Sequence, residues 1–199
     1  GGQFSQGWDA YEAGLSCGVR EVAVRDFPRW EGQALVGKSI LVAAEQGLGD
    51  EIMFASCLAD LLAKASPARC ILECDSRLAP LFARSFPQLS ILGERNTQEA
   101  SRISAHLPID FQIPIGSLPL YLRQSAEDFP RQQSYLHCDQ SQLDAWRTRL
   151  QQLGPGPKVG IAWRGGREVR AHNLRSTNLA QWQRVLQVPG VHFIGLQYG

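Results

Sequence analysis

The sequence predicts an α/β protein with a doubly wound, mostly parallel sheet, followed by the start of a second α/β domain. Two observations carry this prediction: short continuous apolar runs alternate with amphipathic segments, and glycine or proline closes most of these segments. A continuous apolar run is typical of a strand that is buried on both faces, as in a parallel sheet. The 199 residues, of which 44% are hydrophobic, suffice to bury such a core.

The N-terminal segment is predicted to be an amphipathic helix. Its apolar residues recur at helical spacing and form one stripe, which comprises Phe4, Trp8, Tyr11 and Leu15. The segment 16–37 has an irregular pattern that is typical of a surface connection. We therefore expect residues 1–30 to form a terminal helix and a connection, with the stripe covered by upstream chain or by a second copy in a homodimer.

The next segment, 31–138, is predicted to be the first nucleotide-fold (Rossmann-like) domain. Its first buried strand is the run 40–44, and a helix is expected from about Asp50 to just before Pro67. Cysteines and a leucine alternate along a second strand, at 70–74, and this alternation predicts one buried strand face. Further elements are expected as helices at 77–86 and 117–122, the latter capped by Ser117, and as strands at 89–92 and 111–115.

The last segment, 139–199, is predicted to be a linker helix and the incomplete start of a second Rossmann-like domain. The expected elements are a helix at 143–153, a glycine and proline hinge, strands at 158–163 and 191–196, and a helix at 179–186. Two strands and one helix cannot bury a parallel sheet on both faces, so we expect these residues to be part of a larger domain.

Composition narrows the function classes. Lys and Arg total 20 against 19 for Asp and Glu, so no overall positive field would recruit nucleic acid or an anionic membrane. No apolar run reaches the roughly 20 residues that span a bilayer. Five scattered cysteines without a CxxC pair indicate a reducing compartment and no metal site. We therefore expect a cytoplasmic protein without a membrane span.

The strongest chemical signal is the glycine loop Glu45-Gln46-Gly47-Leu48-Gly49-Asp50, which links the first buried strand to a helix. Open α/β sheets bind ligands at such strand ends, and the glycines would allow a tight turn and a close approach to a ligand. The carboxylates of Asp50 and Glu51 have two interpretations. They can cap the helix and complement its dipole, or Asp50 can accept a proton from an attacking sugar hydroxyl.

A resemblance adds to this reading. The strings EQGLGDEIMF, LECDSRLAPLF, SYLHCD, VGIAWRGG and FIGLQYG, in this order and spacing, resemble the glycosyltransferase domain of heptosyltransferase and O-GlcNAc-transferase type that follows tetratricopeptide repeats in bacterial proteins. The resemblance covers nearly the whole chain. It implies a GT-B architecture, in which the acceptor binds the first domain and a nucleotide sugar binds the second.

The resemblance also implies roles for individual residues. Asp50 would be the general base, and residues 45–49 (Glu45, Gln46, Gly47, Leu48 and Gly49) would contact the substrate. The acceptor would be a glycan or a protein, tetratricopeptide repeats would lie upstream, and neither a metal nor another cofactor would be required. The candidates for contacts with the donor phosphates are Trp163, Arg164, His172, Arg175, Ser176 and Gln197. Among them, Arg164 and Arg175 carry planar guanidinium groups, which suit phosphate.

One departure and two alternatives stay open. The family often has an acidic residue between its histidine and arginine, whereas here Asn173 and Leu174 lie between His172 and Arg175. Since most donor contacts of the family lie in the distal second domain, we expect this chain to be inactive alone. The alternatives are a noncatalytic ligand-binding or protein-interaction scaffold and, less favoured because the rest of the surface is not basic, a nucleic-acid-binding protein.

Overall fold

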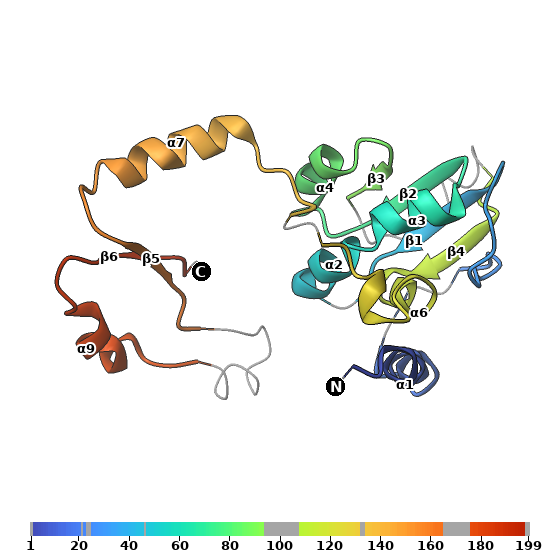
Figure 1. Cartoon of the computed structure of the whole chain (residues 1–199), viewed down its shortest axis with the longest axis horizontal. Coiled ribbons are helices and arrows are strands. Elements are labelled where there is room, and N and C mark those ends of the chain that lie inside the picture. Colours follow the sequence, from blue (N-terminus) through green and yellow to red (C-terminus); the bar gives the residue numbers. More distant parts are fainter. Residues whose placement is uncertain are drawn as a thin grey trace. The chain divides into compact units, whose positions relative to one another are not determined.

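The computed structural model describes residues 2–20, 22, 25–45, 47–93, 108–131, 134–164 and 176–197. The chain divides into two compact units, residues 1–139 and 140–199, each of which is described by itself (Figure 1). The N-terminal helix belongs to the first unit, which also contains the predicted Rossmann-like domain.

The first unit contains a four-stranded sheet in which every pairing is parallel, and this confirms the predicted α/β class with a mostly parallel sheet. The strand order is β3-β2-β1-β4. The strands are β1 (Ser39–Ala43), β2 (Arg69–Glu73), β3 (Ser90–Leu92) and β4 (Phe111–Pro114). In register, Ile40 lies opposite Cys70 on one side and Phe111 on the other. All five residues of β1 are buried, as the apolar run predicts.

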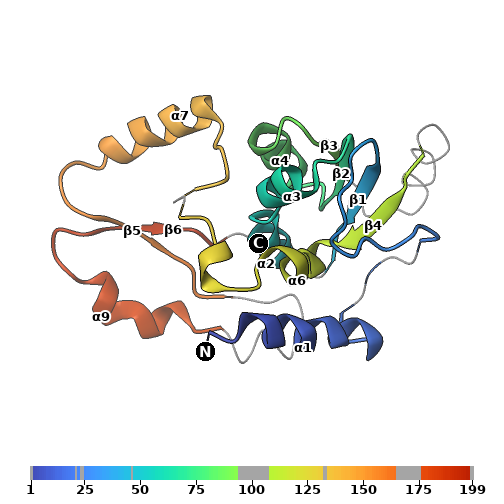
Figure 2. The same cartoon turned by 45° about the vertical axis from the view of Figure 1, so that its right-hand side comes forward.

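The described helices of the first unit contribute to one large core. They are α1 (Phe4–Ser16), α2 (Leu48–Ala55), α3 (Leu58–Ala65), α4 (Ala79–Ser85) and α6 (Leu118–Leu122), with the 3-10 turns η1 (Ile115–Ser117) and η2 (Ala126–Asp128). Figure 2 shows α2, α3 and α4 side by side against the strands. Ile40 and Val42 face this helical core, whereas Leu41 faces the opposite side and packs with Ile71 and Ile109. The doubly wound topology, with helices on both faces, stays a prediction.

Two local predictions for this unit are wrong. The single helix expected from Asp50 to Pro67 is broken at Ser56, where α2 ends. The buried Arg123 explains the break, since its Nη2 donates to the carbonyl oxygen of Ser56 (3.0 Å) and its Nε to Asp60 (2.8 Å). Ser117 does stand at the N-cap position of α6, but its side chain makes no capping hydrogen bond, and its hydroxyl oxygen accepts a hydrogen bond from Arg20 (3.1 Å).

The apolar stripe of α1 packs on its own unit. Trp8 donates its indole N–H to the carbonyl oxygen of Arg123 (2.7 Å), and the ring centroid of Phe4 lies 4.9 Å from that of Phe129. Tyr11 packs against Phe54 of α2 at 5.7 Å. The stripe is therefore half-buried without an upstream repeat or a second copy.

The second unit is small. It comprises α7 (Gln140–Gln151), the parallel pair β5 (Lys158–Ile161) and β6 (His192–Gly195), the 3-10 turn η3 (Leu179–Trp182) and α9 (Gln183–Leu186). Among its described residues, Ile161 is the one buried apolar residue. Over the described parts of both units, no helix is long and apolar enough to cross a membrane.

Candidate functional site

The loop after β1 leads directly into α2. Gly47 is the N-cap residue of α2, with φ −102° and ψ 172°, and neither Gly47 nor Gly49 has a positive φ. Other residues adopt such angles as well, so the backbone conformation alone does not require glycine here, and the predicted close approach to a ligand stays a prediction. Both glycines are exposed, and a Cβ added at Gly49 would meet no atom within 4 Å.

Asp50 lies in the first turn of α2 and is half-buried. Its Oδ2 accepts a hydrogen bond from the backbone N–H of Gly47 at 3.1 Å, which is the helix-capping contact that one interpretation predicts. No described residue donates a hydrogen bond to its Oδ1. One oxygen of this carboxylate thus fixes the side chain, and the other accepts no hydrogen bond from a described residue.

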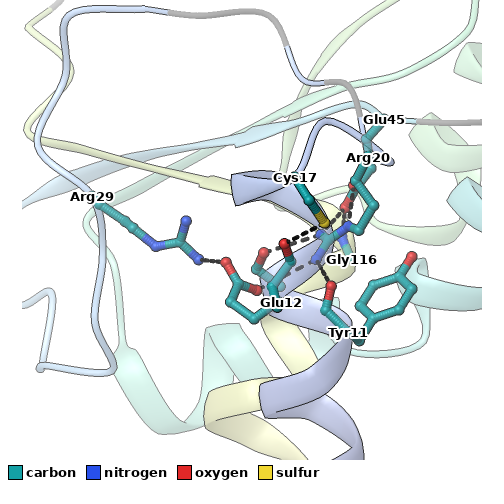
Figure 3. A network of polar contacts seen from close by, with 9 residues as sticks. Tyr11, Glu12, Cys17, Arg20, Arg29, Glu45 and Gly116 are labelled. Carbon is teal, nitrogen blue, oxygen red and sulfur yellow. Dashed lines mark hydrogen bonds and ion pairs between the residues drawn. The ribbon is translucent and has the colours of Figure 1, made fainter.

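Glu45 lies at the end of β1 and is fully enclosed. Its two carboxylate oxygens accept hydrogen bonds from Nε (2.9 Å) and Nη2 (2.7 Å) of Arg20, and the exposed fraction of these side chains is 0% for Glu45 and 2% for Arg20 (Figure 3). Burial acts to lower the pKa of Arg20, but the hydrogen bonds and charge of Glu45 outweigh it and raise this pKa above its ordinary value. Glu45, expected to contact substrate, is therefore placed to hold the loop in position.

The Arg20–Glu45 pair joins three elements. Nη1 of Arg20 donates to the carbonyl oxygen of Tyr11 (3.2 Å) in α1, and the guanidinium lies over the Tyr11 ring at 4.1 Å. The backbone N–H of Gly116, in η1, donates to Glu45. A Cβ added at Gly116 would lie 2.2 Å from Oε1 of Glu45, so only glycine fits at this close approach. The pair thus ties α1 and η1 to the end of β1 that bears the candidate loop.

Two further buried carboxylates stabilise the same sheet edge. Glu51 is fully buried and accepts a hydrogen bond from the backbone N–H of Asp75 (2.9 Å), so it ties α2 to the end of β2. Glu73 accepts from the backbone N–H of Ala44 (3.2 Å) and pairs with Arg25. Over the described residues, no group of three or more His, Cys, Asp or Glu side chains could hold a metal ion.

No local pattern in the sequence marks Arg20 or Arg25 as parts of this edge. Both lie in the connection expected to be an irregular surface segment, 25 and 48 residues from their carboxylate partners. The carboxylates themselves are a signal that could have predicted such partners. Glu45 and Glu73 lie in or beside buried strands, and buried charges are paired.

The donor-site candidates lie in the second unit, at the carboxyl ends of β5 and β6. Oε1 of Gln197 accepts hydrogen bonds from the backbone N–H groups of Trp163 (3.3 Å) and Arg164 (2.9 Å). Thr177, next to Ser176, donates its N–H to the carbonyl oxygen of Trp163 (2.8 Å). A cavity of about 390 Å³ lies here, lined by Trp163, Arg164, Thr177, Asn178 and Leu179.

The structure thus brings four of the six predicted donor-site residues together, namely Trp163, Arg164, Ser176 and Gln197. The other two, His172 and Arg175, lie outside the described residues, as does Gln46 of the glycine loop.

Among curated proteins, the chain is similar to Protein FlbA of Caulobacter vibrioides (strain ATCC 19089 / CIP 103742 / CB 15), with 36% identity over 208 aligned residues. The match takes in the whole of this chain and 35% of FlbA, so the chain spans about a third of the length of this relative. No family model matches the chain, and no solved structure matches it.

Proposed function

We propose that this chain is the acceptor-side domain, and the start of the donor-side domain, of an inverting glycosyltransferase with the GT-B architecture. The observation that carries the proposal is Asp50. This half-buried carboxylate follows a glycine loop at the carboxyl end of a central parallel strand, is fixed through Oδ2 by Gly47, and keeps Oδ1 open among the described residues. Such a strand end is where open α/β sheets bind their ligands.

In the proposed reaction, Oδ1 of Asp50 accepts the proton of an acceptor hydroxyl on a glycan, a lipid-linked sugar or a protein. The hydroxyl oxygen forms a bond to the anomeric carbon of a nucleotide sugar. The bond from that carbon to the phosphate oxygen breaks, and its electron pair leaves with the nucleoside diphosphate. Arg164, together with His172 and Arg175, stabilises the charge that develops on this leaving group, with neither a metal nor another cofactor.

The cluster at the ends of β5 and β6 supports the donor half of this proposal. Gln197 joins the backbone after β5 to the segment after β6, and Trp163 and Arg164 line the adjoining cavity. The carboxyl ends of parallel strands are where open α/β sheets bind their ligands. The doubly wound Rossmann topology of both domains, a cytoplasmic location, a bacterial source and upstream tetratricopeptide repeats belong to the same proposal.

Calorimetry tests the proposal on the natural full-length protein and on residues 1–199, titrated with UDP-, GDP- and ADP-sugars. We expect one of these donors to bind the full-length protein and to bind residues 1–199 far more weakly. Gln197→Ala removes the acceptor shared by two backbone N–H groups, so it should weaken donor binding, whereas Gln142→Ala on the exposed face of α7 should not. Absence of binding by the full-length protein to any nucleotide sugar would count against the donor site.

A second candidate function, a noncatalytic interaction scaffold, is favoured by one observation. An apolar cavity of about 470 Å³ lies against α1 and is lined by Phe4, Trp8, Tyr11, Phe129 and residues beside them. If the parent protein keeps its function with Asp50→Asn and loses it with Trp8→Ala, the scaffold function replaces the catalytic one.

A further inference from the structure

The helix α1 has little support of its own. No side chain caps its N-terminus, no acidic residue lies in its first turn, and no basic residue lies in its last turn. Gly7 and Gly14 lie inside it, and glycine weakens a helix. A helix of 13 residues without such support is marginal in water. The helical state of α1 therefore depends on its contacts with the rest of the first unit.

Those contacts leave α1 at the periphery of the core. No residue of the helix is completely buried. Trp8 donates its indole N–H to Arg123, and Tyr11 packs against Phe54, but both side chains of the helix stay half-exposed. Segments with few buried apolar contacts open locally at a lower free energy than the whole domain unfolds. We therefore expect α1 to detach while the sheet stays folded.

Arg20 follows α1 and is fixed to it. Its backbone N–H donates to the carbonyl oxygen of Gly14 (3.0 Å), and its Nη1 donates to that of Tyr11 (3.2 Å) and to the carboxylate of Glu12 (3.4 Å). Figure 3 shows the guanidinium in contact with this helix and with Glu45. Movement of α1 away from the sheet would therefore withdraw Arg20 from Glu45.

This withdrawal would disturb the strand end that carries the glycine loop. The fully buried carboxylate of Glu45 would lose the cation that balances it. A buried charge without a partner is strongly unfavourable, so the end of β1 would have to move until this carboxylate reaches water. Gly116 would then lose the acceptor of its backbone N–H. Gly47, whose N–H holds Asp50, lies two residues after Glu45, so the movement would extend to the candidate loop.

We propose that α1 and Arg20 together form a latch for the glycine loop. With α1 docked, Arg20 neutralises Glu45 and the loop is held in place. With α1 released, the cation leaves and the loop loosens, so any change that favours release lowers the order of the loop. The latch concerns the order of the loop and is independent of whether the chain transfers sugar.

Native-state hydrogen exchange of residues 1–199, followed by NMR for each amide in increasing denaturant, tests the latch. Two buried amides report on the strand end: that of Glu51, which donates to the carbonyl oxygen of Gly47 (3.1 Å), and that of Gly116. The amide of Leu41, buried in β1, reports on the sheet. We expect the amides of α1, Glu51 and Gly116 to exchange through one shared opening that precedes the opening of Leu41.

Two results of this measurement would overturn the proposal. In the first, α1 opens while Glu51 or Gly116 keeps the protection of Leu41, so release of the helix does not reach the loop. In the second, α1 exchanges only together with Leu41, so the helix does not open by itself.

Trp8→Ala shifts the latch without touching its charges. The change removes the hydrogen bond to Arg123 and part of the packing of α1. The amides of Glu51 and Gly116 should therefore exchange about tenfold faster or more. Leu81→Ala is the matched control, because this half-buried residue of α4 packs on the same core and should not accelerate the two amides.

A variant without the charges separates the latch from direct contact between α1 and α2. In Arg20→Met combined with Glu45→Gln, release of α1 no longer leaves a buried carboxylate unpaired. Adding Trp8→Ala to this variant should therefore change the exchange of Gly116 much less than Trp8→Ala does alone. An equal acceleration in both backgrounds would overturn the proposal, and the exchange of the wild type decides if the charge-free variant does not fold.

Discussion

The buried ion pair between Arg20 and Glu45 gives the sharpest stability prediction. Both side chains are almost completely enclosed and meet through two hydrogen bonds of 2.9 and 2.7 Å. Glu45→Gln keeps the size of the side chain and an acceptor for Gly116 but leaves the Arg20 charge buried without its main partner. Breaking such a pair costs about 3 to 5 kcal/mol of unfolding free energy. At about 2 to 4 °C per kcal/mol for a chain of this size, Tm should fall by about 6 to 20 °C.

A double-mutant cycle isolates the interaction. Arg20→Met should destabilise by a similar amount, and the combination with Glu45→Gln should cost less than the two single changes added, by about 2 kcal/mol or more, because no unpaired charge remains. Chemical denaturation followed by circular dichroism measures the four proteins. The control Lys64→Gln, in a half-exposed pair with Asp128, should cost no more than about 1 kcal/mol. A loss below 1 kcal/mol in Glu45→Gln, or strict additivity, would refute the reasoning.

Three further predictions follow from the first unit and from its cysteines. In the native chain, a thiol reagent at pH 8 should modify the exposed Cys17 and Cys138 rapidly. The other three cysteines are buried and should react slowly, and burial raises the pKa of Cys57 to about 11 and that of Cys70 to about 12. Rapid modification of all five would contradict this. Gly116→Ala should lower the unfolding free energy by about 1 to 3 kcal/mol, since its Cβ would lie 2.2 Å from Glu45, and a neutral effect in denaturant would show that the contact relaxes freely. Hydrogen bonds from the start of β1 hold the pKa of Asp110 below its ordinary value of 3.8, so this carboxylate stabilises the fold above that pH and loses its contribution as the pH falls through the lower pKa. The stability difference between wild type and Asp110→Asn should therefore shrink in acid, and a difference that is constant from pH 7 to pH 2 would contradict the assignment.

Strands were predictable because burial on both faces leaves a continuous apolar run. The run at 40–44 became the central strand β1, and Cys70, Leu72 and Cys74 all face the helical core, as their alternation predicts. These features depend on residues near one another in the chain, and local pattern is what a single sequence reveals.

Features that depend on distant partners could not be predicted. At the break between α2 and α3, the carbonyl oxygen of Ser56 accepts a hydrogen bond from Arg123, which lies 67 residues further along the chain. Gly116 must be glycine because Glu45 arrives from 71 residues away, whereas the more conspicuous Gly47 and Gly49 adopt ordinary angles. At the candidate site the sequence predicts Asp50 at a helix start after a buried strand, but it does not predict that one carboxylate oxygen accepts the N–H of Gly47.

The most direct test of the central claim concerns the open oxygen of Asp50. The measurement is kcat for nucleoside diphosphate release by the natural full-length protein, with its sugar donor and with water or an added acceptor, for wild type and Asp50→Asn. The amide still accepts the N–H of Gly47 through its oxygen, so Tm should change little, while kcat should fall about 10²- to 10⁴-fold because the proton acceptor is gone. An unchanged kcat in the folded variant would contradict the catalytic role and leave Asp50 as a helix cap.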